Sequence, residues 1–361
     1  MPDSDIRPYS ARPTLRVDGA QNDRIDAAMC EMRLREQVGG LSSAELRFYD
    51  SVAKSDGTAA FAFADGRVLR LGAELRLYAG DAATPQEIFR GNISAIETEA
   101  GLAAPPSFAV LAEDALQKAR RSRRSATYVD KSPADVVRTV AGRLGIKVTV
   151  NDGLDKPVCT WLQMNETDLS FLRRMLRDFD GDMQMVGDNL QVGPRARDDR
   201  GQIDLTYGAN LRQIRITADL ADVATQVRVA GWDPRQGTAV SAVAADGTLG
   251  PGSGPTGKDL VSQALGASCQ ELVGHHGEMT QSEADVLARS IFAARARRFV
   301  RASGTADGNP QLRVGTKLRF LGVNALLATT VTVVEATHRF DLADGYVTDF
   351  GAEGAFLGVP N

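Results

Sequence analysis

Two stretches that lie far apart in the chain share one residue pattern, and this repeat most limits the possible folds. Leu69–Tyr78 reads LRLGAELRLY and Leu312–Leu321 reads LRVGTKLRFL. In both, apolar and charged residues alternate, which is the pattern of a strand with one buried face. Gly72 and Gly315 stand at the same position, where a strand bends most easily. The pattern predicts two related strands, each with a bend or bulge at its glycine.

A second match follows each stretch at a similar distance. Ile93–Glu97 reads ISAIE and Val331–Glu335 reads VTVVE. Because both motifs occur in the same order, duplication explains them better than coincidence does. We predict two homologous small antiparallel β-barrels, the first over 1–111 and the second over 205–233 together with 310–361. Sandwiches are the main alternative.

Between these units the apolar period changes from 2 to about 3.6, which is typical of helices. Ser132–Gly145 has an N-cap serine, a proline at the first helical position and a final glycine. Asn165–Phe179 and Thr280–Phe299 have apolar stripes at helical spacing, the second after a capping box. We predict helices at all three, in an inserted α/β (helical) module made of 112–204 together with 234–309.

The predicted fold class is therefore α+β, with two β-units and the inserted module between them. Asp233–Asp259 contains hardly any large apolar side chain. A segment of that composition contributes little to a core, so we expect an exposed, mobile loop.

Composition excludes several classes of protein. The 42 Lys plus Arg against 46 Asp plus Glu give a formal net charge of -4, whereas a coat for nucleic acid or anionic lipid needs a basic excess. No apolar run approaches the ~20 residues that cross a bilayer, and Asp3 and Asp5 stand where a signal peptide would be basic. We expect synthesis in the cytoplasm without a signal peptide. Cys30, Cys159 and Cys269 fit no metal-ligand spacing and are expected to be free thiols.

The motifs with possible chemistry do not predict a reaction. Gly274–Glu278 (GHHGE) has two adjacent histidines that cannot both face one ion on a regular element, so a polar loop is favoured. Asp178–Asp182 (DFDGD) resembles the start of a calcium loop, but Met183 and Asn189 replace its glycine and bidentate glutamate. These carboxylates are expected to solvate a helix end. No GxSxG, HExxH or P-loop motif is present. We predict no enzyme, no cofactor and no metal site.

One basic run is the candidate interaction site. Lys118, Arg120, Arg121, Arg123 and Arg124 place five cations within seven residues. An acidic protein partner or a solvated face is the favoured interpretation. Nucleic acid is not expected as a direct ligand, because no aromatic residues alternate with the cations for base stacking.

Six segments follow one another in a characteristic order: the LRLG strand, Glu87–Glu97, Val110–Ile146, Gln163–Leu176, Val227–Pro234 and Thr337–Phe350. Together they resemble the phage late control gene D family, which comprises tail hub proteins of contractile phages, related to the hub portion of VgrG in type VI secretion. The resemblance covers about residues 10 to 355.

This resemblance implies two homologous tube-like barrels with an inserted module, and a homotrimer whose six similar barrels match a sixfold inner tube to a threefold spike. The implied function is a non-enzymatic baseplate hub, built into the tail of a virion or another contractile particle. Implied partners are a separate spike protein, an inner tube protein or tube initiator, and baseplate wedge proteins, but no membrane. The chain ends at Asn361 soon after the second barrel, so we expect no fused needle. Residues 351–361 are a candidate contact to the spike, and a frayed tail is the equal alternative.

Two other functions stay open. Tyr128–Val148 resembles, over a short stretch, a peptidoglycan-binding LysM pattern, so a peptidoglycan-binding or cell-wall-degrading tail-tip protein is the alternative. The other is an adaptor that uses Lys118–Arg124 to hold nucleic acid or an acidic effector.

Overall fold

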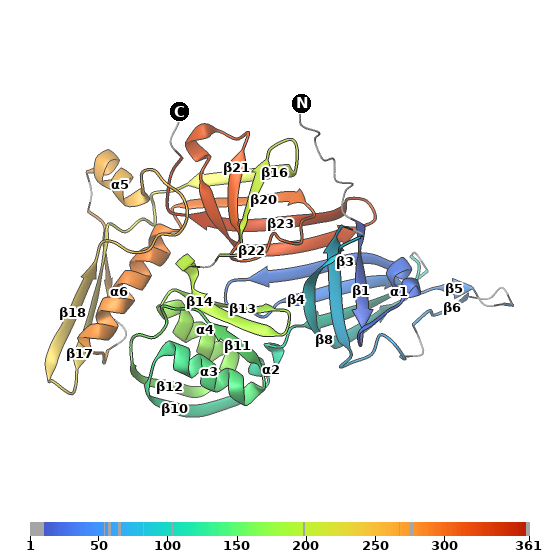
Figure 1. Ribbon diagram of the computed structural model, residues 1–361, viewed down its shortest axis with the longest axis horizontal. Helices are drawn as coiled ribbons and strands as arrows, with labels where there is room; N and C mark the ends of the chain where they lie inside the picture. The colour runs from blue at the N-terminus through green and yellow to red at the C-terminus, as the bar shows by residue number, and fades with distance from the viewer. Residues whose placement is uncertain are drawn as a thin grey trace.

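The structure is a computed structural model that describes residues 11–53, 55–56, 59–63, 66–81, 83–102, 104–197, 199–266, 268–274 and 277–358. Most of its regular structure is β, and one sheet of 13 strands in these residues includes both β1, from the N-terminal part, and β23, from the C-terminal part. Figure 1 shows the N-terminal and C-terminal units beside one another, with two inserted units attached to them. Within the described ranges, no helix is both long and apolar enough to pass through a bilayer.

The N-terminal unit is an antiparallel sheet with the strand order β3-β4-β9-β8-β7. Apolar residues alternate along its strands, and the inward ones form one core that includes Leu34, Leu46 and Leu75. β1 extends the sheet beyond β7, and α1 adds Ile25 to the core. The elements are β1 Ala11–Val17, β2 Ala20–Gln21, α1 Asp23–Ala28, β3 Met29–Gln37, β4 Ser43–Tyr49, β5 Val52–Ala53, β6 Ala59–Ala60, β7 Glu74–Gly80, β8 Gln86–Glu99 and β9 Ser107–Glu113.

The C-terminal unit has the corresponding order β16-β20-β23-β22-β21, again antiparallel throughout. Its core includes Leu318, Val331 and Phe350. At the outer edge the units differ, because β15 runs parallel to β21 whereas β1 runs antiparallel to β7. The elements are β15 Gln202–Thr206, β16 Leu211–Ala218, β20 Val300–Asp307, β21 Lys317–Leu321, η2 Ala325–Leu327, β22 Thr330–Asp341 and β23 Gly345–Gly354.

The same glycine-centred turn begins β7 and β21. Gly72 has φ +83° and its N–H donates to the Ile93 carbonyl at 2.8 Å, while Gly315 has φ +89° and its N–H donates to the Val333 carbonyl at 2.9 Å. Such φ values suit glycine. The predicted bends are confirmed, although each strand begins only two residues after its glycine, because the preceding residues form the turn. Ile93 corresponds to Val333 and not to Val331, a shift of two residues that keeps the same face.

Irregularities of the two sheets also coincide. A bulge follows Met29 in the β3–β4 pair and Leu211 in the β16–β20 pair. Another follows Ile93 in the β8–β9 pair and Val333 in the β22–β23 pair. Since a bulge fixes the local register, the two units share strand order, register and the places where the ladders are interrupted.

The two units are joined by direct pairing of β22 with β3. Glu335–Asp341 runs antiparallel to Glu31–Gln37, with Glu335 opposite Gln37 and Asp341 opposite Glu31. The strands β16-β20-β23-β22-β3-β4-β9-β8 therefore form one continuous sheet, which we call the shared sheet.

The first inserted unit, residues 114–197, has its own core, which includes Val137, Leu172 and Val192. Its predicted helix at Ser132–Gly145 is confirmed: Ser132 Oγ accepts the Asp135 N–H at 3.2 Å, and Gly145 ends the helix with φ +66°. The elements are α2 Gln117–Arg120, β10 Arg123–Lys131, α3 Pro133–Leu144, β11 Lys147–Val150, β12 Cys159–Thr167, α4 Asp168–Asp178, β13 Gly181–Val186, β14 Asn189–Pro194 and η1 Arg195–Arg197.

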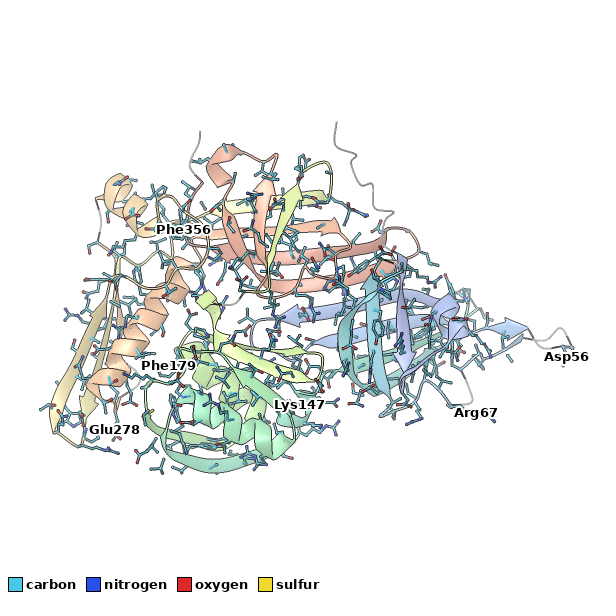
Figure 2. The ribbon with its side chains drawn as sticks, viewed as in Figure 1. Asp56, Arg67, Lys147, Phe179, Glu278 and Phe356 are labelled. Carbon is cyan, nitrogen blue, oxygen red and sulfur yellow. The ribbon has the colours of Figure 1, made fainter. Side chains whose placement is uncertain are left out.

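The next predicted helix, Asn165–Phe179, is shorter than expected. Its first residues belong to β12, so α4 begins at Asp168 after Thr167, whose side chain caps it. Apolar spacing did not reveal this boundary because the strand leads directly into the helix. Phe179, labelled in Figure 2, follows α4. Its ring packs edge-on against that of Trp161, with ring centroids 5.4 Å apart.

The second inserted unit, residues 219–299, lies between β16 and β20, where the N-terminal unit has only the turn between β3 and β4. Its predicted helix is confirmed at α6, capped by Thr280, although the helix ends at Ala296 and Phe299 lies beyond it. β17 pairs with β18 and β19. The elements are β17 Gln226–Asp233, β18 Thr238–Ala244, α5 Gly257–Leu265, β19 Gln270–Val273 and α6 Gln281–Ala296.

Two predictions for this segment are wrong. β17 does not join the C-terminal β-unit, as the grouping 205–233 requires, because alternation marks a buried face without showing which element covers it. Asp233–Asp259 is not one exposed loop, since β18 buries Val240 and Ala242 against α6. The two inserted units also have separate cores. The other predicted limits, 1–111, 112–204 with 234–309, and 310–361, stay predictions.

Candidate functional site

One face of the shared sheet is lined with charged side chains across both units. In an antiparallel sheet, directly paired residues point to the same side, so register identifies the members of this face. On β3, for example, Glu31, Arg33 and Arg35 alternate with buried residues that face the cores. We define the polar face by Arg215, Arg301, Glu335, Arg339, Glu31, Arg33, Arg35, Glu45, Arg47, Glu97 and Glu99.

One end of the polar face, around Arg33, Arg47 and Arg339, is hollowed into a groove of about 1010 Å³. Its floor includes Arg33 of β3 and Arg47 of β4, and its walls come from Glu99–Leu102, Ala104 and Pro105 of the β8–β9 connection and from the end of β22. Its lining combines charges of both signs with apolar side chains such as Leu102 and Leu342, so the groove can hold water and mobile solutes.

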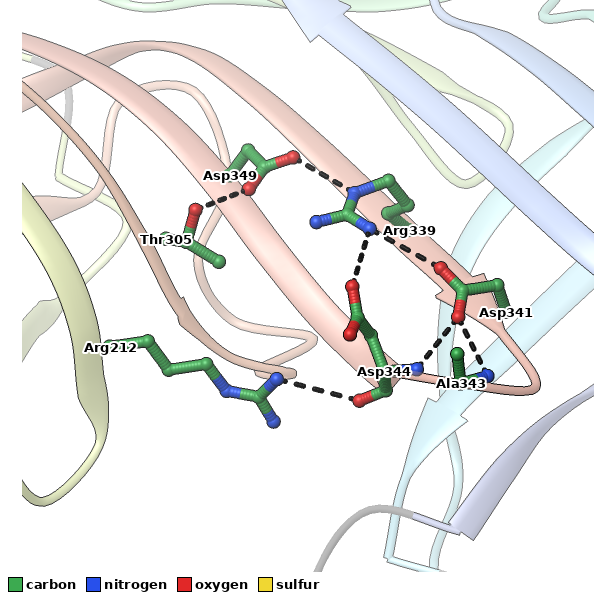
Figure 3. A network of polar contacts seen from close by, with 7 residues as sticks. All are labelled: Arg212, Thr305, Arg339, Asp341, Ala343, Asp344 and Asp349. Carbon is green, nitrogen blue, oxygen red and sulfur yellow. Dashed lines mark hydrogen bonds and ion pairs between the residues drawn. The ribbon is translucent and has the colours of Figure 1, made fainter.

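Ion pairs order the side chains of this face where β22 meets β23. Arg339 lies 3.1 Å from Asp349, 3.3 Å from Asp341 and 3.3 Å from Asp344 (Figure 3). Hydrogen bonds from backbone N–H groups, of Asp344 first, lower the pKa of Asp341, so it stays ionised. Arg212 of β16 reaches the carbonyl oxygen of Asp344 at 3.4 Å. The hairpin turn is therefore tied to β22, β23 and β16.

Similar pairs cross between strands elsewhere on the polar face. Arg47 lies 3.3 Å from Glu99 and 3.9 Å from Glu31, and Arg35 lies 3.7 Å from Glu335 across the β3–β22 boundary. Exposed pairs of this kind contribute little to stability, about 0–1 kcal/mol each. Their effect is to hold opposite charges next to each other, so the face carries no strong field of one sign.

Beneath the polar face, a buried polar cluster seals the boundary between the two units. Arg313 Nε donates to Glu36 Oε2 at 2.6 Å, and Arg313 Nη2 donates to Glu36 Oε1. Burial alone would raise the pKa of Glu36, but the Arg313 charge and its hydrogen bonds lower it, so the pair is ionised. Because one partner comes from each unit, this ion pair links the N-terminal sheet to the turn before β21.

His338 belongs to the same buried cluster. Its Nδ1 lies 2.8 Å from Tyr346 Oη and 3.3 Å from Thr348 Oγ1. Burial, and next the positive charge of Arg313, lower the pKa of His338 to about 4. The imidazole is therefore neutral at pH 7 and shielded from solvent, so it is a structural group and not an accessible base.

The first inserted unit forms hydrogen bonds with the turn between β3 and β4. Arg173 donates to the carbonyls of Gly39 at 2.8 Å and Gly40 at 2.7 Å, and Asp182 accepts the Gly39 N–H at 2.6 Å. Asp114 accepts the Ser42 N–H at 2.6 Å, and burial raises its pKa to about 6. The unit is thus fixed to one end of the shared sheet by buried and partly buried hydrogen bonds.

A second buried network connects both inserted units with β23. Arg297, which follows α6, donates to Asp180 and lies 3.6 Å from Glu353, while Arg195 donates to Glu353 at 2.5 Å. The prediction that the carboxylates of Asp178–Asp182 solvate a helix end is therefore wrong for Asp180 and for Asp182, which are buried. Sequence spacing could not reveal this, because Arg297 lies 117 residues from Asp180.

The basic run is divided between α2 and the start of β10. Arg120 pairs with Glu113, Arg121 Nη2 donates to Gln117 Oε1 at 2.6 Å, Arg123 Nη1 donates to the Asn165 carbonyl at 3.0 Å, and Arg124 lies 3.4 Å from Asp168. Lys118, Arg120, Arg121 and Arg123 are exposed. The five cations therefore share one region, but several already hold their own chain together.

The remaining motifs add no site in the described residues. His275 and His276 of the GHHGE motif lie outside the ranges that the structure describes, as do Asp3, Asp5 and Asn361. Among the residues that are described, no group of three or more His, Cys, Asp or Glu side chains is arranged to hold a metal ion.

Comparison with known families assigns the chain. A family model described as Alg8 N-terminal domain matches residues 10–341. The chain belongs to the Alg8 N-terminal domain family. Comparison with curated proteins finds no match for this Alg8 N-terminal domain chain. The late control gene D family of the sequence resemblance is a different assignment, and it stays a prediction.

Solved structures show that this Alg8 N-terminal domain chain has a fold found in tail proteins. The 43 kDa tail protein of prophage MuSo2 from Shewanella oneidensis matches with a TM-score of 0.67 at 13% identity, covering 95% of this chain and 98% of that one. A tail protein from Neisseria meningitidis MC58 matches with 0.65 at 10% identity, covering 96% and 97%. An E. coli type VI secretion component, similar in structure to the T4 tail proteins gp27 and gp5, matches with 0.56 at 12%, covering 96% and 79%.

Sequence reasoning missed the polar face and the buried cluster beneath it. A signal for the first was present, since MCEMRLREQ alternates charged and apolar residues over all of β3. The pairing of β3 with β22 was not readable, because its partners are about 300 residues apart. Glu36 lies two residues after Leu34 and four after Met32, so alternation places its side chain on the buried face of β3. The sequence could therefore predict a buried carboxylate, but it could not identify Arg313 as the partner.

Proposed function

We propose that this chain is a non-enzymatic structural hub of a contractile tail or injection-system baseplate, acting as a homotrimer. The observation that carries the proposal is the internal repeat: two units with one strand order, one register and coinciding bulges form a single sheet. Two such units in each of three chains give six nearly equivalent positions around an axis, while the inserted units occur only three times. That arrangement matches a sixfold tube on one side to a threefold spike on the other.

We infer that the two units are homologous small barrels and that the polar face lines the inside of the ring. The face is hollowed at the end that includes Arg47 and Arg339, and its charges are paired across strands by Arg47, Arg35 and Arg339. A lumen lined by balanced charges keeps its water and does not trap a passing chain of either sign. The tail-protein fold of the solved relatives is consistent with this role.

The proposed partners are a separate spike protein, an inner tube protein or tube initiator, and wedge proteins on the outside. We propose that a wedge protein or another acidic protein binds at the basic run, Lys118–Arg124. Lys118 is exposed on α2, and Arg121 is exposed just after it. The variant Lys118→Ser/Arg121→Ser should reduce co-purification with that partner and leave the trimer intact. Unchanged co-purification would remove the run from the proposal.

Native mass spectrometry of the full chain, alone and with co-expressed spike and tube proteins, tests the main proposal. The expected species has three times the chain mass of 38.6 kDa, and electron microscopy should show a ring with an open axis. A chain that stays monomeric at all concentrations and ignores both partners contradicts the proposal. A muramidase assay and a pull-down on purified sacculi test the cell-wall alternative, and binding in either would favour it instead.

A further inference from the structure

We infer that neighbouring copies of this chain join strand to strand, with β16 of one copy adding to Ala95–Glu99 of β8 in the next. The inference rests on the proposed trimer and names the surface that would build it. The chain contains the template for this contact, because β22 of its C-terminal unit already adds to β3 of its N-terminal unit in the same way.

The equivalence of strands follows from hydrogen bonds and bulges and not from sequence identity. β8 corresponds to β22. The carbonyls of Ile93 and Val333 accept equivalent hydrogen bonds, from the glycine N–H of each unit, and an equivalent bulge follows each of them. β16 corresponds to β3, since Leu211 and Met29 precede the same bulge in the same pairing. A contact between β8 and β16 would therefore repeat the β22–β3 boundary with the units exchanged.

Both strand edges needed for this contact are open in the described part of the chain. The pairing of β8 with β7 ends at Asn92. One edge of Ala95–Glu99 pairs with β9, and the other edge has no neighbouring strand in the described residues. β16 is the last strand of the shared sheet, and β20 is the one named strand that pairs with it. Leu211, at its start, also makes an isolated bridge to Tyr207, and η2 lies near β16. An open edge with free N–H and C=O groups is a template for another strand.

The register of the β22–β3 boundary predicts the register between copies. Applied to β8 and β16, it places Glu99 opposite Arg215, Glu97 opposite Thr217 and Ile96 opposite Ala218. Within the chain the position of the first pair is taken by Arg339 and Arg33. The boundary between copies would thus gain a pair of opposite charges, Glu99 with Arg215, on the polar face.

Burial points to the same contact. Ile96 is 44% exposed, whereas its counterpart Ala336 is fully buried where β22 meets β3. Its side chain lies on the core side of the sheet, opposite Val110, so a strand added at this edge would cover it. An apolar side chain that is exposed on an open edge and buried at the equivalent closed edge is expected if the edge closes in the assembly.

A contact of this kind is head to tail, because each copy offers a different strand to each neighbour. Repeated around an axis, it continues the shared sheet from copy to copy with the polar face always on one side. If the step between copies equals the step between the two units of one chain, three copies close the ring.

Cysteine cross-linking tests the contact. In a Cys269→Ser background, one preparation carries Glu99→Cys and another carries Arg215→Cys. After mixing, subunit exchange and treatment with an oxidant or a short bis-maleimide, a covalent dimer of the two variants should form, whereas neither should cross-link alone. A chain with both substitutions should give covalent trimers. The matched control is Glu45→Cys with Arg215→Cys, because β4 is paired on both sides and should not react.

The outcomes separate this inference from the proposed function. A trimer by native mass spectrometry with the Glu99–Arg215 cross-link, and no reaction of the Glu45 control, supports both. A trimer that never cross-links through this pair overturns the contact and leaves the hub intact. A permanent monomer overturns the hub and the contact together.

Charge reversal gives a second measurement that needs no new thiol. Arg215→Glu sets two carboxylates opposite each other at every junction, and we expect association to weaken about tenfold per junction. Arg177→Glu makes the same change on the exposed face of α4, away from both edges, and should leave association unchanged. Equal association of the two variants contradicts the contact.

Discussion

His338 should make the stability of the folded chain depend on pH in a way that one substitution removes. Its ordinary pKa is 6.5, and burial lowers it to about 4 in the folded chain. Between these values the unfolded chain binds a proton that the folded chain does not, so stability is present above pH 6.5 and is lost as pH falls. From pH 7 to pH 5 the loss from this one group is about 1.8 kcal/mol.

The variant His338→Asn keeps an acceptor near Tyr346 Oη but cannot titrate. Urea unfolding of both proteins at pH 7 and pH 5 should show the difference between them shrinking by about 1.8 kcal/mol at the lower pH. The comparison is needed because Asp114 acts oppositely: its raised pKa, about 6, contributes stability that is lost as pH rises. In the difference between the two proteins, Asp114 cancels.

A direct titration provides the second measurement. The chain has three histidines, and the imidazole NMR signal that His338→Asn removes should titrate near pH 4. If that signal titrates near 6.5, or if the stabilities of the two proteins fall in parallel between pH 7 and pH 5, His338 is not buried in its neutral form and the account of the sealed boundary is wrong.

Three further predictions concern stability in urea. Arg313→Met leaves Glu36 charged and buried without its partner, which should lower the free energy of unfolding by about 3–5 kcal/mol at pH 7. Adding Glu36→Leu should recover most of the loss. Equal stability of the single and double variants would contradict the pairing. Thr280→Ala removes the cap of α6 and should cost about 1 kcal/mol. The control Thr139→Ala, at an exposed position within α3, should cost nothing because alanine has the higher helix propensity. Gly142→Ala in α3 should stabilise the chain by about 0.5–1 kcal/mol, because a Cβ there meets no neighbour. Gly91→Ala should destabilise it, because the new Cβ would lie 2.2 Å from a backbone oxygen of β9. The opposite order of stability would contradict this packing.

Features encoded by neighbouring residues could be predicted from the sequence. The caps at Ser132 and Thr280 depend on residues three positions apart, and both helices begin where expected. The turns at Gly72 and Gly315 were predicted because glycine and alternation are local signals. Even the two-residue offset between the matched strands preserved the buried face, since a strand repeats every two residues.

Features that depend on distant partners could not be predicted. β17 has the alternation of a barrel strand, yet it pairs with β18 and β19, because alternation does not encode which sheet a strand joins. Asp180 sits in a motif that resembles a solvated loop, and only the fold brings Arg297 to it. The polar face was missed for the same reason, since its strands come from both ends of the chain.

Both inserted units leave the shared sheet from the same end. β9 ends at Glu113 and β16 at Ala218, and register places these residues at one end, whereas the connections after Glu99 and Asp341 lie at the other. An assembly built on this sheet would therefore be wider at the end that has the inserted units than at the other end. In the proposed ring, components that approach along the axis would meet two different rims, so the order of stacking would follow from shape before any specific contact forms.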